Sequence, residues 1–192
     1  MLDISKTMVS AAALAHIVHG NPGNCKLEEI TLGWGFSSYL SLEALQPAIM
    51  SLRSITVGLG GSLGEDALKR LPAACPMLET VILHFQVISD TVIINILAYL
   101  RNLRSFHCWD VSFSIQKIIS HGCPGLISIH LEECREVTAN GVSSLLDCAA
   151  IEDLLLHHNG PGIQKTFTFY AASKLPMLRK ISLECLQTKV SD

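Results

Sequence analysis

Four histidines and one glutamate have the side chains best suited to binding a metal ion. His84, His107, His130 and His157 recur at intervals of 23 to 27 residues, and Glu132 lies two residues beyond His130. Imidazole nitrogens together with a carboxylate suit zinc. However, no two of these residues have the compact spacing of a zinc motif, and several predicted strands separate His84 from His157. We therefore expect ordinary surface histidines, and we predict neither a metal nor a cofactor.

A glycine-rich segment, Gly58–Gly64, is the second candidate for chemistry. Its sequence, GLGGSLG, follows a predicted strand and precedes a predicted helix around Asp66–Leu71, as a dinucleotide-binding loop would. Its spacing is GxGxxxG, however, the next strand ends at Leu83-His84 without an acidic ligand for ribose, and the P-loop sequence Gly-Lys-Ser/Thr is absent. No pair of carboxylates stands out. A nucleotide-dependent enzyme is therefore a minor hypothesis, and we predict that the chain is not an enzyme.

Aliphatic residues spaced as LxxLxL recur through the chain and define the elements that would position these side chains. The seven occurrences begin 23 to 27 residues apart, within the range of leucine-rich repeats. Each triplet predicts a short strand whose aliphatic side chains face a core. The triplets are Leu27/Ile30/Leu32, Leu52/Ile55/Val57, Leu78/Val81/Leu83, Leu103/Phe106/Cys108, Leu126/Ile129/Leu131, Ile151/Leu154/Leu156 and Leu178/Ile181/Leu183.

Apolar residues at helical spacing lie between most of these triplets. They predict helices within residues 42–52, 67–71, 92–100, 115–119 and 142–146. The last segment between strands, Gly160–Leu175, is ambiguous because it contains a Gly-Pro-Gly turn and the β-prone run Thr166–Tyr170.

These elements predict an α/β leucine-rich-repeat solenoid. It would be a curved horseshoe of about seven strand–helix repeats, with a parallel sheet on its concave face. Residues 1–192 are expected to form a single domain. In it, residues 1–24 would be an N-terminal cap or partial repeat, formed by one convex helix and a turn, and residues 25–192 would hold the repeats.

The composition argues against two classes of partner. Hydrophobic residues make up 49% of the chain and charged residues 16%, the net charge is −3, and the pI is about 6.2. This balance gives no basic surface for nucleic acid or anionic lipid. No uninterrupted apolar run is long enough to cross a bilayer. We therefore predict neither a nucleic-acid nor a membrane partner.

The N-terminal stretch and the cysteines bear on the compartment. Lys6 followed by the apolar run Met8–Val18 resembles a weak signal peptide, but Asp3 precedes the run, and His16 and His19 interrupt the apolar region. We favour a buried cap helix. The seven cysteines are scattered singly with no CxxC pair, which indicates small buried thiols in a reducing compartment. The expected location is cytoplasmic or nuclear.

One repeat identifies the subtype. Over Cys123–Leu146 the order C-P-x-L-x-x-I-x-L-x-x-C-x-x-V-T-x-x-G-V-x-x-L resembles the cysteine-containing leucine-rich repeat of F-box proteins. The other repeats keep the aliphatic residues but only part of the remaining pattern. The stretches Glu43–Val92 and Gly160–Glu184 resemble plant F-box-like leucine-rich-repeat proteins that also carry a BTB/POZ domain.

That resemblance implies a function. In such proteins the repeats select a protein for ubiquitination, while an F-box or BTB module contacts the adaptor or cullin scaffold. Neither module is visible in this sequence, so we expect the chain to be a fragment or isoform whose ligase contacts lie elsewhere. The first hypothesis is substrate recognition for a cullin-type ubiquitin ligase. The alternative is a generic leucine-rich-repeat scaffold or inhibitor with no role in ubiquitination.

The expected concave face supplies the candidate partner-binding residues. Strand alternation turns the residues beside the aliphatic positions outward, and their types change from glycine and threonine to histidine, tryptophan and leucine in the middle repeats. Exposed aromatic side chains at such a position are typical of a protein interface. The alternative is that the tryptophan packs beside Phe106 or Phe113 and is structural. The candidates are His84, His107, Trp109, His130, Glu132, Leu155 and His157.

Overall fold

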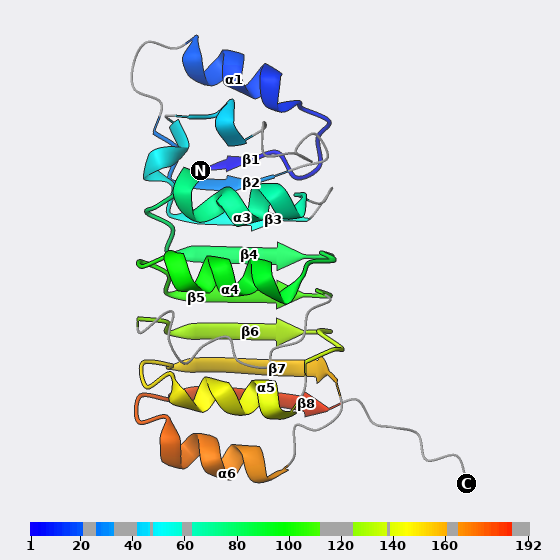
Figure 1. Cartoon of the computed structure of the whole chain (residues 1–192), viewed down its shortest axis with the longest axis vertical. Helices are drawn as coiled ribbons and strands as arrows, with labels where there is room; N and C mark the ends of the chain where they lie inside the picture. The colour runs from blue at the N-terminus through cyan, green and yellow to red at the C-terminus, as the bar shows by residue number, and fades with distance from the viewer. Residues whose placement is uncertain are drawn as a thin grey trace, which may run out of the picture.

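One parallel sheet of eight strands organises the chain. The structure, a computed structural model, describes residues 1–20, 26–32, 42–46, 48–58, 63–111, 125–137, 139–160 and 165–185. The strand order follows the chain order from β1 to β8, and the sheet is open, with β1 and β8 toward opposite ends of the molecule (Figure 1). The strands are β1 (Leu2–Asp3), β2 (Glu29–Thr31), β3 (Ser54–Val57), β4 (Thr80–His84), β5 (Ser105–Trp109), β6 (Ser128–Glu132), β7 (Asp153–Asn159) and β8 (Lys180–Cys185). All seven predicted strands are confirmed, and this α/β arrangement is consistent with a solenoid.

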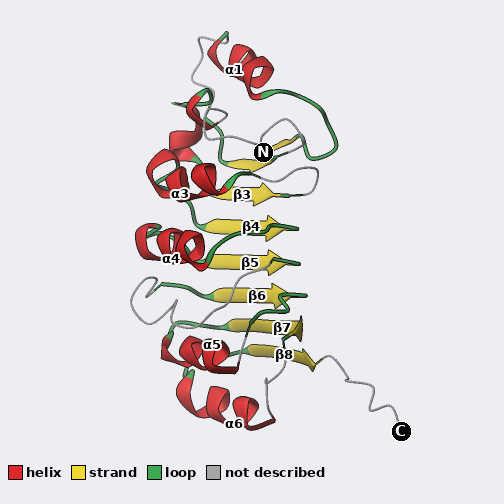
Figure 2. Cartoon of the chain, turned by 45° about the vertical axis from the view of Figure 1, so that its right-hand side comes forward, coloured by secondary structure: helices red, strands yellow, loops and turns green. Residues whose placement is uncertain are grey.

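The helices of the described residues lie on one side of the sheet or beyond its two ends, as Figure 2 shows. The prediction is confirmed for the segments that form α3, α4 and α5. Within residues 42–52 the described part contains helical residues at Leu42-Glu43 and a 3-10 helix, and residues 115–119 lie outside the described part. The helices are α1 (Ala11–His19), α3 (Glu65–Ala74), α4 (Asp90–Tyr99), α5 (Ala139–Ser144) and α6 (Lys165–Lys174), with 3-10 helices η1 (Ala48–Ser51) and η2 (Leu145–Asp147).

Two predictions about the ends of the chain were incomplete. Residues 1–24 were expected to form one helix and a turn; within the described residues 1–20, the first residues form β1, which pairs with β2, and the helix covers Ala11–His19. The Ser10 hydroxyl accepts a hydrogen bond from the Ala13 amide at 3.2 Å and so begins α1 late. The ambiguous segment near the other end is the helix α6 despite its β-prone residues, because burial of Phe167 and Ala171 against the preceding unit outweighs local preference.

The core lies between the sheet and the helices. In β3 to β6 every second residue is buried, so their aliphatic side chains point to the helical side. Helix α4 buries Val92, Ile93, Ile96 and Leu97 against them. The cysteines at 75, 108, 134 and 148 are buried, as expected, and burial raises the pKa of Cys75 to about 12. No described helix is both long and apolar enough to pass through a membrane.

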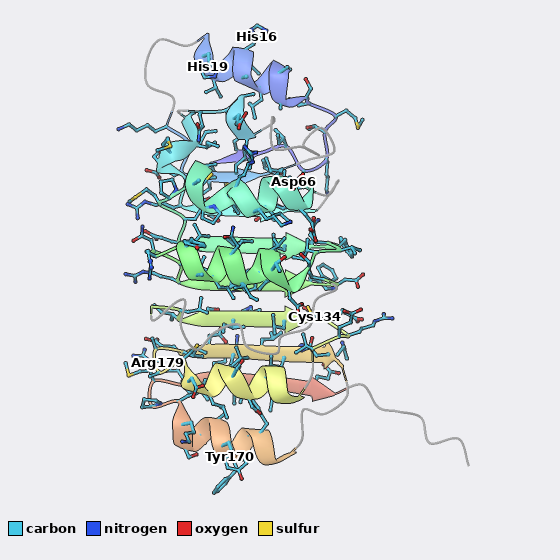
Figure 3. The ribbon with its side chains drawn as sticks, in the orientation of Figure 1. His16, His19, Asp66, Cys134, Tyr170 and Arg179 are labelled. Carbon is cyan, nitrogen blue, oxygen red and sulfur yellow. The ribbon has the colours of Figure 1, made fainter. Side chains whose placement is uncertain are left out.

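Buried polar side chains occupy one position at the carboxyl ends of the strands. This position lies eight residues after the first aliphatic of a triplet; in the described units it holds Gln86, Val111, Cys134 and Asn159, all at most 3% exposed, and Gln86 and Asn159 are the polar ones. Figure 3 shows Cys134 at this end of the sheet. The Asn159 amide accepts a hydrogen bond from the Cys134 N–H and donates one to the Leu131 carbonyl, both at 3.0 Å. This role of Asn159 was not predicted, although leucine-rich repeats admit asparagine or cysteine here.

Replacement of Asn159 should therefore destabilise the fold. We expect Asn159→Ala to lower the free energy of unfolding by about 2–3 kcal/mol, because two buried backbone groups lose their partner. Asn159→Cys should recover part of the loss, since cysteine occupies the same position in the preceding unit. The matched control is Asn102→Ala, which removes an exposed amide bonded to the Pro76 carbonyl and should change stability by less than about 0.5 kcal/mol. Urea unfolding measures all three, and equal effects at Asn159 and Asn102 would contradict the assignment.

Gly58 has a structural reason to be glycine. Its φ is +105°, and an added Cβ would collide with the His84 carbonyl oxygen on the neighbouring strand. Gly64 precedes α3, and the glycines at 60 and 61 lie outside the described residues. The need for glycine at Gly58 thus follows from the approach of β3 to the end of β4, without a bound nucleotide.

This explanation predicts the cost of a methyl group. Gly58→Ala should lower the free energy of unfolding by about 2–4 kcal/mol through backbone strain and the collision. Gly125→Ala is the control, because a Cβ there meets nothing within 4 Å. The comparison is made by thermal or urea unfolding with no nucleotide present, and a stable Gly58→Ala protein would refute the steric argument.

Candidate protein-interaction face

The sheet has an open face, defined here as the face turned away from the helices. Parallel pairing in register aligns its side chains in three rows that run across the strands. The first row is Ser54, Thr80, Ser105, Ser128, Asp153 and Lys180. The second is Thr56, Ile82, His107, His130, Leu155 and Ser182, and the third is His84, Trp109, Glu132, His157 and Glu184.

All seven candidate residues lie on this open face and are half-buried or exposed. His107, His130 and Leu155 are neighbours in the second row. The other four form the third row from β4 to β7. The structure thus brings the predicted residues together on one surface, and whether a partner binds there is taken up below as a proposal.

The centre of the open face holds a histidine cluster, defined as His107, Ser128, His130 and Asp153. The imidazole rings of His107 and His130 stack with centroids 4.0 Å apart and an interplanar angle of 9°. The Ser128 hydroxyl lies 3.2 Å from His107 Nε2 and 3.3 Å from His130 Nε2. Asp153 Oδ2 lies 2.9 Å from His130 Nε2. Ser128 and Asp153 were not predicted, although period-two alternation from His130 and Leu155 places both on this face.

The cluster does not have the geometry of a hydrolase triad. In such a triad the serine contacts Nε2 of the histidine and the acid contacts Nδ1. Here Ser128 and Asp153 both approach Nε2 of His130, so the ring cannot relay a proton between them. Among the described residues, no three histidine, cysteine, aspartate or glutamate side chains are placed to hold a metal ion. The contacts bind the four side chains to one another.

Burial keeps two of these histidines neutral. The pKa of His107 is lowered to about 4, chiefly because burial disfavours the imidazolium; positive charge on His130 acts in the same direction, and the Asp153 carboxylate opposes it. Burial also lowers the pKa of His84. His84 Nδ1 is buried without a hydrogen-bond partner. At neutral pH both rings are therefore uncharged surfaces.

An aromatic group lies beside the histidine cluster. The rings of Phe85 and Trp109 have centroids 5.4 Å apart, and His84 meets Trp109 edge-on at 5.5 Å. Trp109 is 41% exposed and Phe85 52% exposed, whereas Phe106 is in the core. Trp109 therefore does not pack down beside Phe106 as the structural alternative required, and Phe113 lies outside the described residues.

The far end of the open face is held by polar contacts. His157 Nε2 lies 2.7 Å from the Ser182 hydroxyl. His158 lies 3.6 Å from a carboxylate oxygen of Glu133 and 3.2 Å from one of Glu184. His157 and His158 thus connect β6, β7 and β8 at their carboxyl ends.

Comparison with known proteins gives one relevant match. No protein-family model matches the chain. The BTB/POZ domain-containing protein FBL11 of Arabidopsis thaliana is 37% identical over 281 residues, which cover 98% of this chain and 30% of that protein. The chain thus spans about a third of the length of the relative. Because the alignment is longer than the chain, the relative also carries segments opposite gaps in this chain. The match agrees with the BTB/POZ resemblance.

The neutral state of His107 predicts a pH dependence. Between about pH 4 and 6.5 the unfolded chain binds a proton on this residue that the folded chain does not bind. The contribution of neutral His107 to the free energy of unfolding is therefore complete above pH 6.5, and it is lost as the pH falls through about 4. We expect His107→Gln to flatten this dependence in urea unfolding. NMR titration of the His107 ring supplies the direct measurement, and a midpoint near 6.5 would contradict the burial argument.

Proposed function

We propose that the chain is a leucine-rich-repeat module that recognises the substrate protein of a cullin-type ubiquitin ligase, and that this protein binds the open face. The repeat spacing and the step-by-step parallel sheet support the leucine-rich-repeat assignment. The similarity to a protein named for its BTB/POZ domain supports the ligase context. The ligase contacts would then come from a BTB or F-box module outside this sequence.

The exposed tryptophan carries the proposal that this face binds a protein. The Trp109 indole is 41% exposed and lies beside the exposed ring of Phe85. Monomeric proteins seldom leave large apolar side chains exposed to solvent in a cluster. Tryptophan is also enriched among the residues that dominate binding energy at protein interfaces. On the same face the stacked rings of His107 and His130 form a fixed surface, and burial keeps His107 uncharged at neutral pH. A rigid surface binds without the entropic cost of ordering its side chains.

The proposal assigns no catalytic role to the chain. The only serine, histidine and aspartate that meet among the described residues share one imidazole nitrogen, and the described cysteines with raised pKa values lack the thiolate character of a nucleophile. We propose that the protein acts by binding. A generic scaffold or inhibitor with the same face is the alternative.

Affinity purification of the full-length protein tests the binding face. We expect Trp109→Ala to weaken partner capture on the order of 30-fold, because truncation of a central tryptophan costs about 2 kcal/mol or more. Tyr99→Ala is the matched control, since Tyr99 is an exposed aromatic on α4, on the opposite side. Capture undiminished by Trp109→Ala in a folded protein would contradict the proposal. Phe85→Ala serves as a second variant if Trp109→Ala unfolds.

The lifetime of the captured partner separates the two functions. Purification with and without a proteasome inhibitor, followed by partner half-life with and without a neddylation inhibitor, reports whether a cullin ligase consumes it. A partner that is retained through Trp109 and becomes longer-lived supports substrate recognition. A retained partner with an unchanged half-life supports the scaffold alternative.

A further inference from the structure

Two carboxylates flank the exposed tryptophan on the open face. Glu132 on β6 is the direct neighbour of Trp109 on β5 in the sheet register, and neighbouring strands lie about 4.8 Å apart. Asp110 follows Trp109 directly, and its N–H donates to the Glu132 carbonyl at 2.9 Å. We define the aromatic–acidic patch as Phe85, Trp109, Asp110 and Glu132.

The backbone fixes the patch at the carboxyl edge of the sheet. Phe85 and Asp110 both have φ of 51°, in the left-handed region that residues other than glycine seldom adopt. Glu133 and His158 repeat this conformation in the next two units, with φ of 57° and 51°. The same bend therefore recurs near the carboxyl ends of β4 to β7, and it places the exposed residues Phe85 and Asp110 at one edge of the sheet with Trp109.

No described cation neutralises these two carboxylates. The nearby Arg135 lies 3.3 Å from Glu133, and His158 bridges Glu133 and Glu184. Neither Asp110 nor Glu132 has a side-chain ion pair within the described ranges. Burial lowers the pKa of His84, the ring that meets Trp109 edge-on, so His84 brings no positive charge at neutral pH. The patch is thus an aromatic surface with negative charge at its rim.

We propose that the partner protein places an arginine side chain on this patch, with its guanidinium stacked on Trp109 and paired with Glu132 or Asp110. This inference rests on the proposed function and names the chemistry that the open face selects. A cation within about 6 Å of an indole centroid is attracted by the ring, and a planar guanidinium both stacks and presents a fork of N–H donors to a carboxylate. An aliphatic side chain would cover the rings but leave both carboxylates desolvated without a partner. A lysine would meet the charge but not the stacking surface.

Titration with a matched pair of small ligands tests the proposal without the partner. The 15N-labelled chain is titrated with N-acetyl-arginine amide and with N-acetyl-citrulline amide, which has nearly the same shape and no charge. The reporter is the indole N–H signal of Trp109, assigned by loss of the other signal in Trp34→Phe. We expect saturable shifts with arginine and binding weaker by on the order of fivefold with citrulline.

Variants locate the binding within the patch. Trp109→Leu, followed through the backbone amide signals of Asp110 and Glu132, should weaken arginine binding by on the order of fivefold, because it keeps an apolar side chain but loses the ring. The double variant Asp110→Asn/Glu132→Gln should weaken it at least as much. Glu136→Gln, which removes one exposed charge from the turn after β6, should change it less than twofold.

The outcomes distinguish failure of the arginine proposal from failure of the proposed function. Equal binding of arginine and citrulline, tighter binding of N-acetyl-lysine amide, or no shift of Trp109 overturns the arginine proposal and leaves Trp109-dependent capture of a partner intact. Undiminished capture by Trp109→Ala instead overturns the proposed function of the open face. An arginine preference lost in Trp109→Leu and in the double carboxylate variant supports the arginine proposal.

Discussion

The in-register parallel hydrogen bonding of β1 to β8 is the constraint on which the rest of the structure depends. Every strand pairs with the next in the chain, so residues one period apart in the sequence become neighbours about 4.8 Å apart. This spacing between strands is close to the distance between the centroids of two stacked rings. It explains why the imidazoles of His107 and His130, each in the second row, meet at 4.0 Å and nearly parallel. The sheet therefore converts a sequence period into a continuous, rigid surface.

The unfavourable features of this arrangement, strained backbone and buried polar groups, lie at the carboxyl ends of the strands. The chain must leave each strand sharply, and its backbone groups must still be paired where the regular ladder stops. Left-handed residues supply the bend, and buried Gln86 and Asn159 supply the missing hydrogen bonds. Strain and burial of polar groups are both unfavourable alone. They persist because the neighbouring units over-determine the conformation.

The same physics separates what the sequence could predict from what it could not. Leu126, Ile129 and Leu131 predicted β6 because period-two burial is written directly in residue type. The open-face position of His107 and Trp109 followed from that register. The left-handed φ of Phe85 could not be predicted, since phenylalanine has no preference for it and the bend is imposed by adjacent strands. Asn159 was predictable from the repeat position but was hidden by the preceding histidine pair.

The open face has two electrostatic environments, one at the middle of the strands and one at their carboxyl ends. Toward the middle of the strands, burial favours neutral imidazole at His107, and the side chains there contact one another. At the carboxyl edge, Asp110 and Glu132 border an exposed indole and face solvent more openly. For the arginine contact that we propose, no cation among the described residues competes for these two carboxylates. The same backbone bend connects the strand ends to the surface: the residue after each left-handed position is buried, and the residue before Asp110 is the exposed Trp109.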